Sequence, residues 1–218
     1  VLTNLYETEF LLKKPFYGFL SGITYAIIAI GLAVIFFPQN PTLVAVGLTA
    51  LFSFPTINKA MDAIFKKEEK EKNFSLKNLW KDNKSSYLIY LYLFLGIFSA
   101  FAIFSLALPQ LATGHLFRSQ LEIIGYTGKA YFDTGLFTQI LVNNIRVFGL
   151  CFIIALILGN GVLFIITWNA SVWGTIFGNL ASTAATTSQK NPFIYFLLIL
   201  ISVIPLSLIH ISEPTRPY

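Results

Sequence analysis

The residues that could do chemistry in this sequence are polar groups set in long apolar stretches. Arg146 is the only charged residue between Asp133 and Lys190, and Asn160 and Thr167 follow it after 14 and 7 residues. These intervals are close to whole numbers of helical turns, so the three side chains are expected on one helix face. Lipid cannot satisfy guanidinium or amide donors, and that face should therefore point into a protein interior.

Two roles for Arg146 compete. Its side chain could extend to the outer lipid headgroups and anchor the helix. Alternatively, it could pair with a buried acceptor from another helix and form part of a functional site, because a charge in the bilayer is costly. The apolar stretches of residues 1–205 contain no acidic residue to act as that partner.

Familiar catalytic patterns are missing from the sequence. His115, the one histidine ahead of the carboxyl tail, lies between apolar stretches and lacks metal-ligand spacing to other residues. Gly159-Asn160-Gly161 lacks the lysine and the length of a phosphate-binding loop. Cys151 lies in an apolar run and is interpreted as a packed thiol. We therefore expect a protein that is not an enzyme and that holds no cofactor or metal.

The composition indicates a lipid environment. Charged residues make up 11% of the chain, against about 25% in an average globular protein. Hydrophobic residues make up 56%, and the mean hydropathy is +0.71. A soluble domain could not cover its surface with so few charges, and a disordered chain, a nucleic-acid-binding surface and a disulfide framework are excluded by the same numbers. The expected partners are the lipid bilayer and other membrane proteins or a second copy of this chain, with no nucleic acid.

The apolar stretches predict an all-α fold, a polytopic transmembrane helical bundle that forms a single domain over residues 1–205. A helix needs about 20 apolar residues to cross a bilayer. Prolines at Pro38–Pro41 and at Pro109 separate the first stretches. About five spans are expected, at about 16–37, 42–58, 86–108, 145–168 and 192–205, with an external segment at 109–136.

The lysines predict the orientation in the membrane. The loop at 59–84 carries 13 of the 25 charged residues, and its lysines place it in the cytoplasm by the positive-inside rule. Lys13 and Lys14 precede the first span, so an inside amino terminus agrees with an inside loop after two crossings. We predict a multi-pass protein of the cell membrane with a cytoplasmic N-terminus. Apolar residues at Met61–Phe65 indicate either an amphipathic helix on the inner membrane face or a solvated linker helix.

Small residues recur at every fourth position in two stretches, a pattern that lets helix backbones approach closely in lipid. The first stripe is Gly18, Gly22 and Ala26, and the second is Ala170, Gly174, Gly178 and Ser182. Residues 170–186 are uncharged but rich in polar residues, so they form either a poor span or a short re-entrant helix held against protein. We favour the re-entrant helix, which leaves Lys190 on the cytoplasmic side.

The last residues are interpreted separately. Leu206–Arg216 back-translate to a string that resembles a transposase-end adapter of sequencing libraries. We expect residues 206–218 to be a non-native tail, the alternative being a short polar carboxyl tail.

The run Asn143-Asn144-Ile145-Arg146-Val147, the glycine-bearing span after it and Trp168-Asn169-Ala170 resemble the stage II sporulation protein M family, most of all its archaeal members. The resemblance extends over residues 1–205. Members of that family continue with a His-Gly-Xaa-Xaa-Glu helix, the natural source of partners for Arg146, which does not follow Pro205 here. The family-motif and packing candidates are Asn143, Asn144, Arg146, Asn160, Trp168, Asn169, Gly174 and Gly178.

The resemblance implies a membrane scaffold or assembly factor without catalysis. The first alternative is a transporter or channel component that uses the polar face of the fourth span. The second is an intramembrane hydrolase whose His-Glu helix is missing from this sequence.

Overall fold

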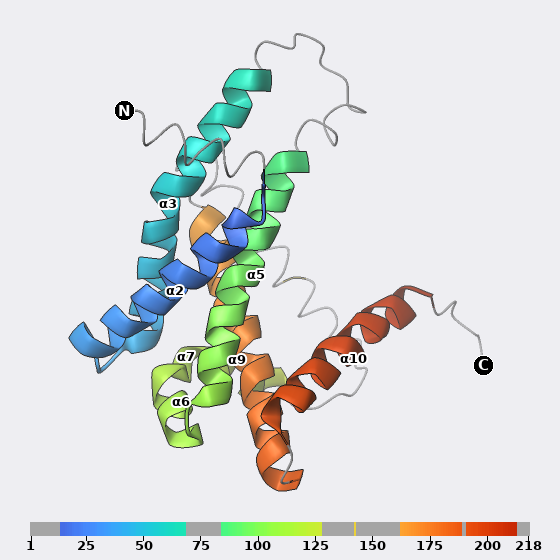
Figure 1. Ribbon diagram of the computed structural model, residues 1–218. Helices are drawn as coiled ribbons and strands as arrows, with labels where there is room; N and C mark the ends of the chain where they lie inside the picture. The colour runs from blue at the N-terminus through green and yellow to red at the C-terminus, as the bar shows by residue number, and fades with distance from the viewer. Residues whose placement is uncertain (1–13, 69–83, 128–141, 143–161, 189–190, 213–218) are drawn as a thin grey trace.

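The computed structural model describes residues 14–68, 84–127, 142, 162–188 and 191–212. All regular structure within these ranges is α-helical, which confirms the predicted all-α class for the described part of the chain. The helices are arranged as shown in Figure 1: α2 (Tyr17–Phe36), α3 (Pro41–Glu68), α5 (Lys84–Ala107), α6 (Gln110–Leu116), α7 (Arg118–Thr127), α9 (Val162–Ser188) and α10 (Pro192–Ser212).

Three of the described helices are long and apolar enough to cross a membrane. They are α2, residues 41–64 of α3, and α5, and they coincide with the first three predicted spans. The side chains of α10 are described only over the apolar stretch Pro192–Ser202, and residues 145–161 of the fourth predicted span lie outside the described residues, so neither prediction is tested. The chain is therefore a helical membrane protein, while its full number of spans stays a prediction.

Helix α2 packs on α5 at backbone distance, and the two helices run in the same direction (Figure 1). A Cβ atom placed on Gly18 would lie 2.9 Å from the carbonyl oxygen of Ile89, and one on Gly22 would lie 2.6 Å from that of Leu93. Real Cβ atoms essentially never come within 3.0 Å of such an atom. Glycine is therefore required where the two helices touch, because a larger residue would push them apart.

Helix α9 packs on the other side of α5 and also runs parallel to it. Gly174 lies against the backbone of Phe98, and a Cβ atom on Gly178 would lie 2.7 Å from the carbonyl oxygen of Ala102. These α5 residues lie about half a helical turn away from those that contact α2, because one turn takes 3.6 residues. Both small-residue stripes thus lie against α5, which runs between α2 and α9.

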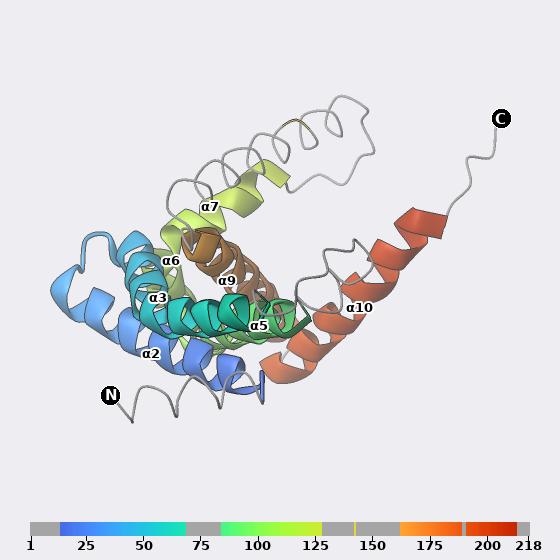
Figure 2. The same cartoon turned by 90° about the horizontal axis from the view of Figure 1, so that it is seen from above.

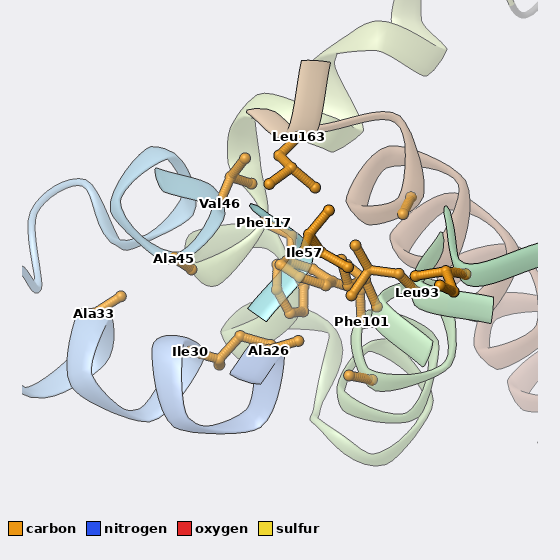
Figure 3. Close-up of a cluster of buried hydrophobic side chains, with 14 of the residues drawn as sticks. Ala26, Ile30, Ala33, Ala45, Val46, Ile57, Leu93, Phe101, Phe117 and Leu163 are labelled. Carbon is orange, nitrogen blue, oxygen red and sulfur yellow. The ribbon is translucent and has the colours of Figure 1, made fainter. Parts of the chain in front are cut away.

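The main core lies where α2, α3, α5 and α9 meet (Figure 3). Ile57 of α3, Phe101 of α5 and Leu163 of α9 converge there, and each is at most 2% exposed. Phe117, between α6 and α7, joins the same cluster, with its ring centre 5.6 Å from that of Phe101. The described part of the segment after α5 is therefore helical and packs against the bundle.

Helix α10 contacts the bundle near its start and then diverges from it (Figures 1 and 2). Phe196 is buried against α9 and α5, and its ring centre lies 6.2 Å from that of Phe98. Phe177 of α9 meets the same Phe98 ring edge to face at 5.9 Å. These contacts form a second, smaller apolar cluster.

The structure corrects the boundary between the second span and the lysine-rich loop. A loop was expected from residue 59, but α3 continues to Glu68 and carries Pro55 inside it. Met61 and Ile64 are buried in the main core, whereas Asp62 faces outward. The helix continues because these apolar side chains still face the bundle after the charges begin, so they are not a separate helix on the membrane surface.

The structure also corrects the expected break after the fourth span. The fourth span was expected to end at residue 168, and a short or re-entrant helix was expected to begin at residue 170. Instead, α9 continues through both positions to Ser188. Because α9 runs parallel to α5, Ser188 lies at the end of the bundle where α5 ends, and Gln110 donates a hydrogen bond to Thr183 at 3.5 Å there. The described part of α9 thus ends at the end of the bundle opposite to Lys84, and Lys190, which was predicted on the cytoplasmic side, lies outside the described residues.

The outer faces of the helices carry large apolar side chains. On α2, Ile28, Ile35 and Phe36 are 47%, 70% and 67% exposed, and Leu51 of α3 is 63% exposed. Soluble proteins rarely expose apolar surface in this quantity, because it would associate in water. The outer surface of the bundle is thus suited to lipid.

Candidate functional site

Half of the predicted site residues lie outside the part of the chain that the structure describes. They are Asn143, Asn144, Arg146 and Asn160. Cys151, which was interpreted as a packed thiol, also lies outside the described residues. Thr167, the third member of the predicted polar face, is described and is 0% exposed. The roles of Arg146 as an anchor or as a buried partner thus stay predictions, while the inward direction of the face is observed at Thr167.

Trp168 and Asn169 have different surroundings although they belong to one motif. Trp168 is half-buried and packs against the main core. Asn169 is exposed, and its Nδ2 donates a hydrogen bond to the carbonyl oxygen of Ile165 at 2.8 Å. This bond is made within α9, and among the described residues Asn169 therefore contributes to its own helix.

Gly174 and Gly178 bring α9 against α5 and thereby position the polar residues beside them. Ser105 of α5 lies in this contact, where its Oγ donates a hydrogen bond to the carbonyl oxygen of Thr175 at 3.0 Å. A side chain on either glycine would meet the α5 backbone, so the approach depends on both. Gly174 and Gly178 therefore bring the backbone of α9 close to that of α5 at this site.

A buried polar face runs along α9, formed by Thr167, Ser171 and Thr175. The three residues are spaced by four, which places them on one side of the helix. All three are 0% exposed. Burying hydroxyl groups in an apolar bundle is unfavourable unless they find hydrogen-bond partners, so the face needs groups from other helices opposite it.

Gln120 of α7 supplies one such group. This glutamine is 0% exposed, and its Nε2 donates a hydrogen bond to Ser171 Oγ at 3.3 Å. The Ser171 hydroxyl in turn donates to the carbonyl oxygen of Trp168 at 2.8 Å. A fully buried glutamine in a segment expected to lie outside the membrane brings α7 directly onto the polar face of α9.

Three buried polar atoms, two on this face and one on Gln120 opposite it, have no hydrogen-bond partner among the described residues. They are Gln120 Oε1, Thr167 Oγ1 and Thr175 Oγ1. Each buried polar atom left without a partner costs about 1–3 kcal/mol. Native proteins contain few such atoms, and each one requires an explanation.

Buried hydroxyls on α3 make a hydrogen bond that Thr167 and Thr175 of α9 do not make. Thr49 donates to the carbonyl oxygen of Ala45 at 2.7 Å, and Ser53 donates to that of Thr49 at 2.8 Å. These bonds to the preceding turn are the usual solution for a hydroxyl in an apolar helix. Thr167 and Thr175 are as deeply buried as Thr49 but do not make such a bond, so the α9 face differs chemically from that of α3.

The α6–α7 pair (residues 110–127) lies beside α3 and α9 and is held there by apolar and polar contacts (Figure 2). Phe117 is buried at the junction of the two helices, and Thr42 donates a hydrogen bond to the carbonyl oxygen of Leu116. His115 Nε2 lies 2.9 Å from the carbonyl oxygen of Pro38 in the turn before α3. These contacts fix the pair, and Gln120 with it, over the polar face.

The chemistry available at the polar face is hydrogen bonding between neutral groups. It contains hydroxyl and amide groups, and within the described ranges no group of three or more His, Cys, Asp or Glu residues could hold a metal ion. Arg118 and Glu122 of α7 form an ion pair at 2.9 Å, but both side chains are exposed. The described face could therefore bind neutral hydrogen-bonding molecules, and it carries no acid or base of its own.

Sequence reasoning found Thr167 but missed Ser171, Thr175 and Gln120. Continuing the same face by steps of four from Thr167 would have reached Ser171 and Thr175. Gln120 gave no comparable signal, because its burial depends on how the α6–α7 pair folds back onto α9.

Comparisons with known proteins return no match for this chain, whether among protein-family models, curated proteins or solved structures.

Proposed function

We propose that this chain is a multi-pass scaffold or assembly protein of the cell membrane, of the stage II sporulation protein M type and without catalysis. The observation that carries the proposal is the double backbone contact of α5, with α2 on one face and α9 on the opposite one. Helices that touch through backbone atoms cannot slide or rotate without collision, because packed interiors resist deformation. Such a rigid framework suits a protein that holds partners in place.

The exposed faces support the same proposal. Large apolar side chains cover the outer sides of α2 and α3, and α10 diverges from the bundle with Ile194 and Ile201 exposed. These faces could contact lipid or other membrane proteins. The run at Asn143–Val147 and the Trp168-Asn169-Ala170 sequence supply the resemblance to the family.

A flux assay tests the scaffold role. The purified protein is reconstituted into liposomes, and the release of monovalent ions and small neutral polyols is compared with that of protein-free liposomes. A scaffold leaves release at the protein-free rate. Release that depends on the protein would contradict the scaffold and favour the alternative.

That alternative is a transporter or channel component, and the buried polar face of α9 with Gln120 opposite is the observation that favours it. Its test uses Arg146→Leu in the same liposomes. Lost flux with unchanged thermal stability would support transport, whereas loss of folding or assembly without any flux to lose would support the scaffold.

A further inference from the structure

We propose that the polar face of α9 and Gln120 of α7 form an internal hydration site, at which water molecules bind between the two helices under the cover of α7. The site goes beyond the scaffold role, because it concerns what occupies the interior of the bundle.

The first step is the position of the atoms without partners. Ser171 lies one helical turn from Thr167 and one from Thr175, and it receives the hydrogen bond of Gln120. One helical turn rises about 5.4 Å. A short row of water molecules along α9 could therefore reach all three atoms that lack a partner among the described residues. Each belongs to a residue that is 0% exposed.

The second step is the chemistry of the ligand. The face offers two hydroxyl groups, which donate and accept, and one amide oxygen, which accepts. The described residues contribute no charged side chain to it, and these neutral donors and acceptors favour a neutral ligand. Water both donates and accepts, and it commonly satisfies buried polar groups through about three hydrogen bonds.

The third step is access. The polar atoms are closed off from solvent as the helices are arranged, so water binds only when α7 moves relative to α9. Phe117 fixes the junction of α6 and α7 in the core, while the polar contact beyond it, from Gln120 to Ser171, is long at 3.3 Å. Water therefore enters between Gln120 and Ser171, where the contact between α7 and α9 is long.

Thr167→Val and Thr175→Val test the site by thermal unfolding in detergent. Valine matches threonine in shape, so the change removes the hydroxyl group and little else. At a hydrated site the valine deprives bound water of its partner, and each variant should lower Tm by about 2–4 °C, the shift that corresponds to one lost hydrogen bond in a chain of this size. An unchanged or raised Tm would overturn the proposal, because removing a dry polar atom without a partner is neutral or stabilising.

Thr49→Val is the matched control. Thr49 is also 0% exposed, but its hydroxyl is bonded to the carbonyl oxygen of Ala45 in its own helix. That carbonyl keeps its helical partner in the variant, so the Tm of Thr49→Val should fall by less than that of the two α9 variants. An equal or larger fall would count against a special environment on α9.

Thiol labelling provides a second readout that needs no comparison of stabilities. In a Cys151→Ser background, Ser171→Cys is exposed to a small uncharged methanethiosulfonate reagent in liposomes, with Ala181→Cys as the control. Ala181 is also 0% exposed, but it lies in the apolar cluster with Phe177. The site predicts that Ser171→Cys reacts at least about tenfold faster, a rate ratio that equals about 1.4 kcal/mol. Equal rates would overturn the proposal.

Discussion

Gly22 of α2 and Gly96 of α5 face each other directly: a Cβ atom on Gly22 would lie 3.4 Å from the Cα atom of Gly96 and 2.6 Å from the carbonyl oxygen of Leu93. At this point the two helices are in contact through their backbones, with no side chain between them. Such contacts give membrane helices much of their attraction, since lipid supplies no hydrophobic drive for association.

Replacing Gly22 with alanine should destabilise the bundle. The added methyl group meets a backbone carbonyl that cannot move aside, and overpacking of this kind costs about 1–3 kcal/mol. Equilibrium unfolding by denaturing detergent measures the change. Gly31→Ala, in the same helix, is the control, because a Cβ atom there meets nothing within 4 Å. If Gly31→Ala proved as destabilising as Gly22→Ala, the backbone contact would not be the cause.

Tyr25→Phe should weaken the pairing of α2 and α3. The Tyr25 hydroxyl and Thr56 Oγ1 share a hydrogen bond of 2.8 Å between these helices. Its loss should lower the free energy of unfolding by about 0.5–1.5 kcal/mol. Ser99→Ala serves as the control, because the Ser99 hydroxyl donates only to Leu95 of its own helix. A double variant with Thr56→Val should add little to Tyr25→Phe, and full additivity would contradict the bond.

Phe117→Ala should detach the α6–α7 pair from the core. The side chain is 0% exposed and packs on Phe101. Truncating a buried phenylalanine typically costs about 3–5 kcal/mol. The variant should also become sensitive to proteases within residues 110–127. Leu111→Ala, at a position that is 92% exposed, should change neither property; a protease-resistant Phe117→Ala would show that the pair is held by other contacts.

The direction of α9 predicts the membrane topology. In a Cys151→Ser background, Lys84→Cys and Ser188→Cys place single thiols at opposite ends of the bundle, and both positions are exposed. With a cytoplasmic lysine-rich loop, an impermeant thiol reagent should label Ser188→Cys on intact cells and Lys84→Cys only after permeabilisation. Labelling of both from the same side would contradict the parallel arrangement of α5 and α9.

The first three spans and the helical class could be predicted from the sequence because each follows from a local property. About 20 apolar residues form a span wherever they occur, and the turn at Pro38–Pro41 needs only its prolines. The end of α3 could not be predicted in this way. Lys59 and Asp62 signal a loop, and only the packed bundle shows that Met61 and Ile64 lie on the inner side of a helix that continues.

Helix α9 shows the same limit more clearly. Its Ser, Thr and Asn residues make it read as a weak span, because hydropathy averages over all faces of a helix. In the structure Thr167, Ser171 and Thr175 face other helices and not lipid, so their polarity says nothing against a long continuous helix. The partner of that face, Gln120, lies 51 residues from Ser171 in sequence, and no local pattern connects them.

The double contact of α5 also decides which movements are open to this molecule. A turn of α5 about its long axis would drive Gly96 and Ala102 out of register with neighbours on both sides at once, so torsion of the central helix is blocked. Among the described helices, α10 is the one that diverges from the bundle after its first turns, so this constraint does not reach its far end. The described bundle therefore has a fixed centre, and a partner that altered its shape would have to act at its periphery.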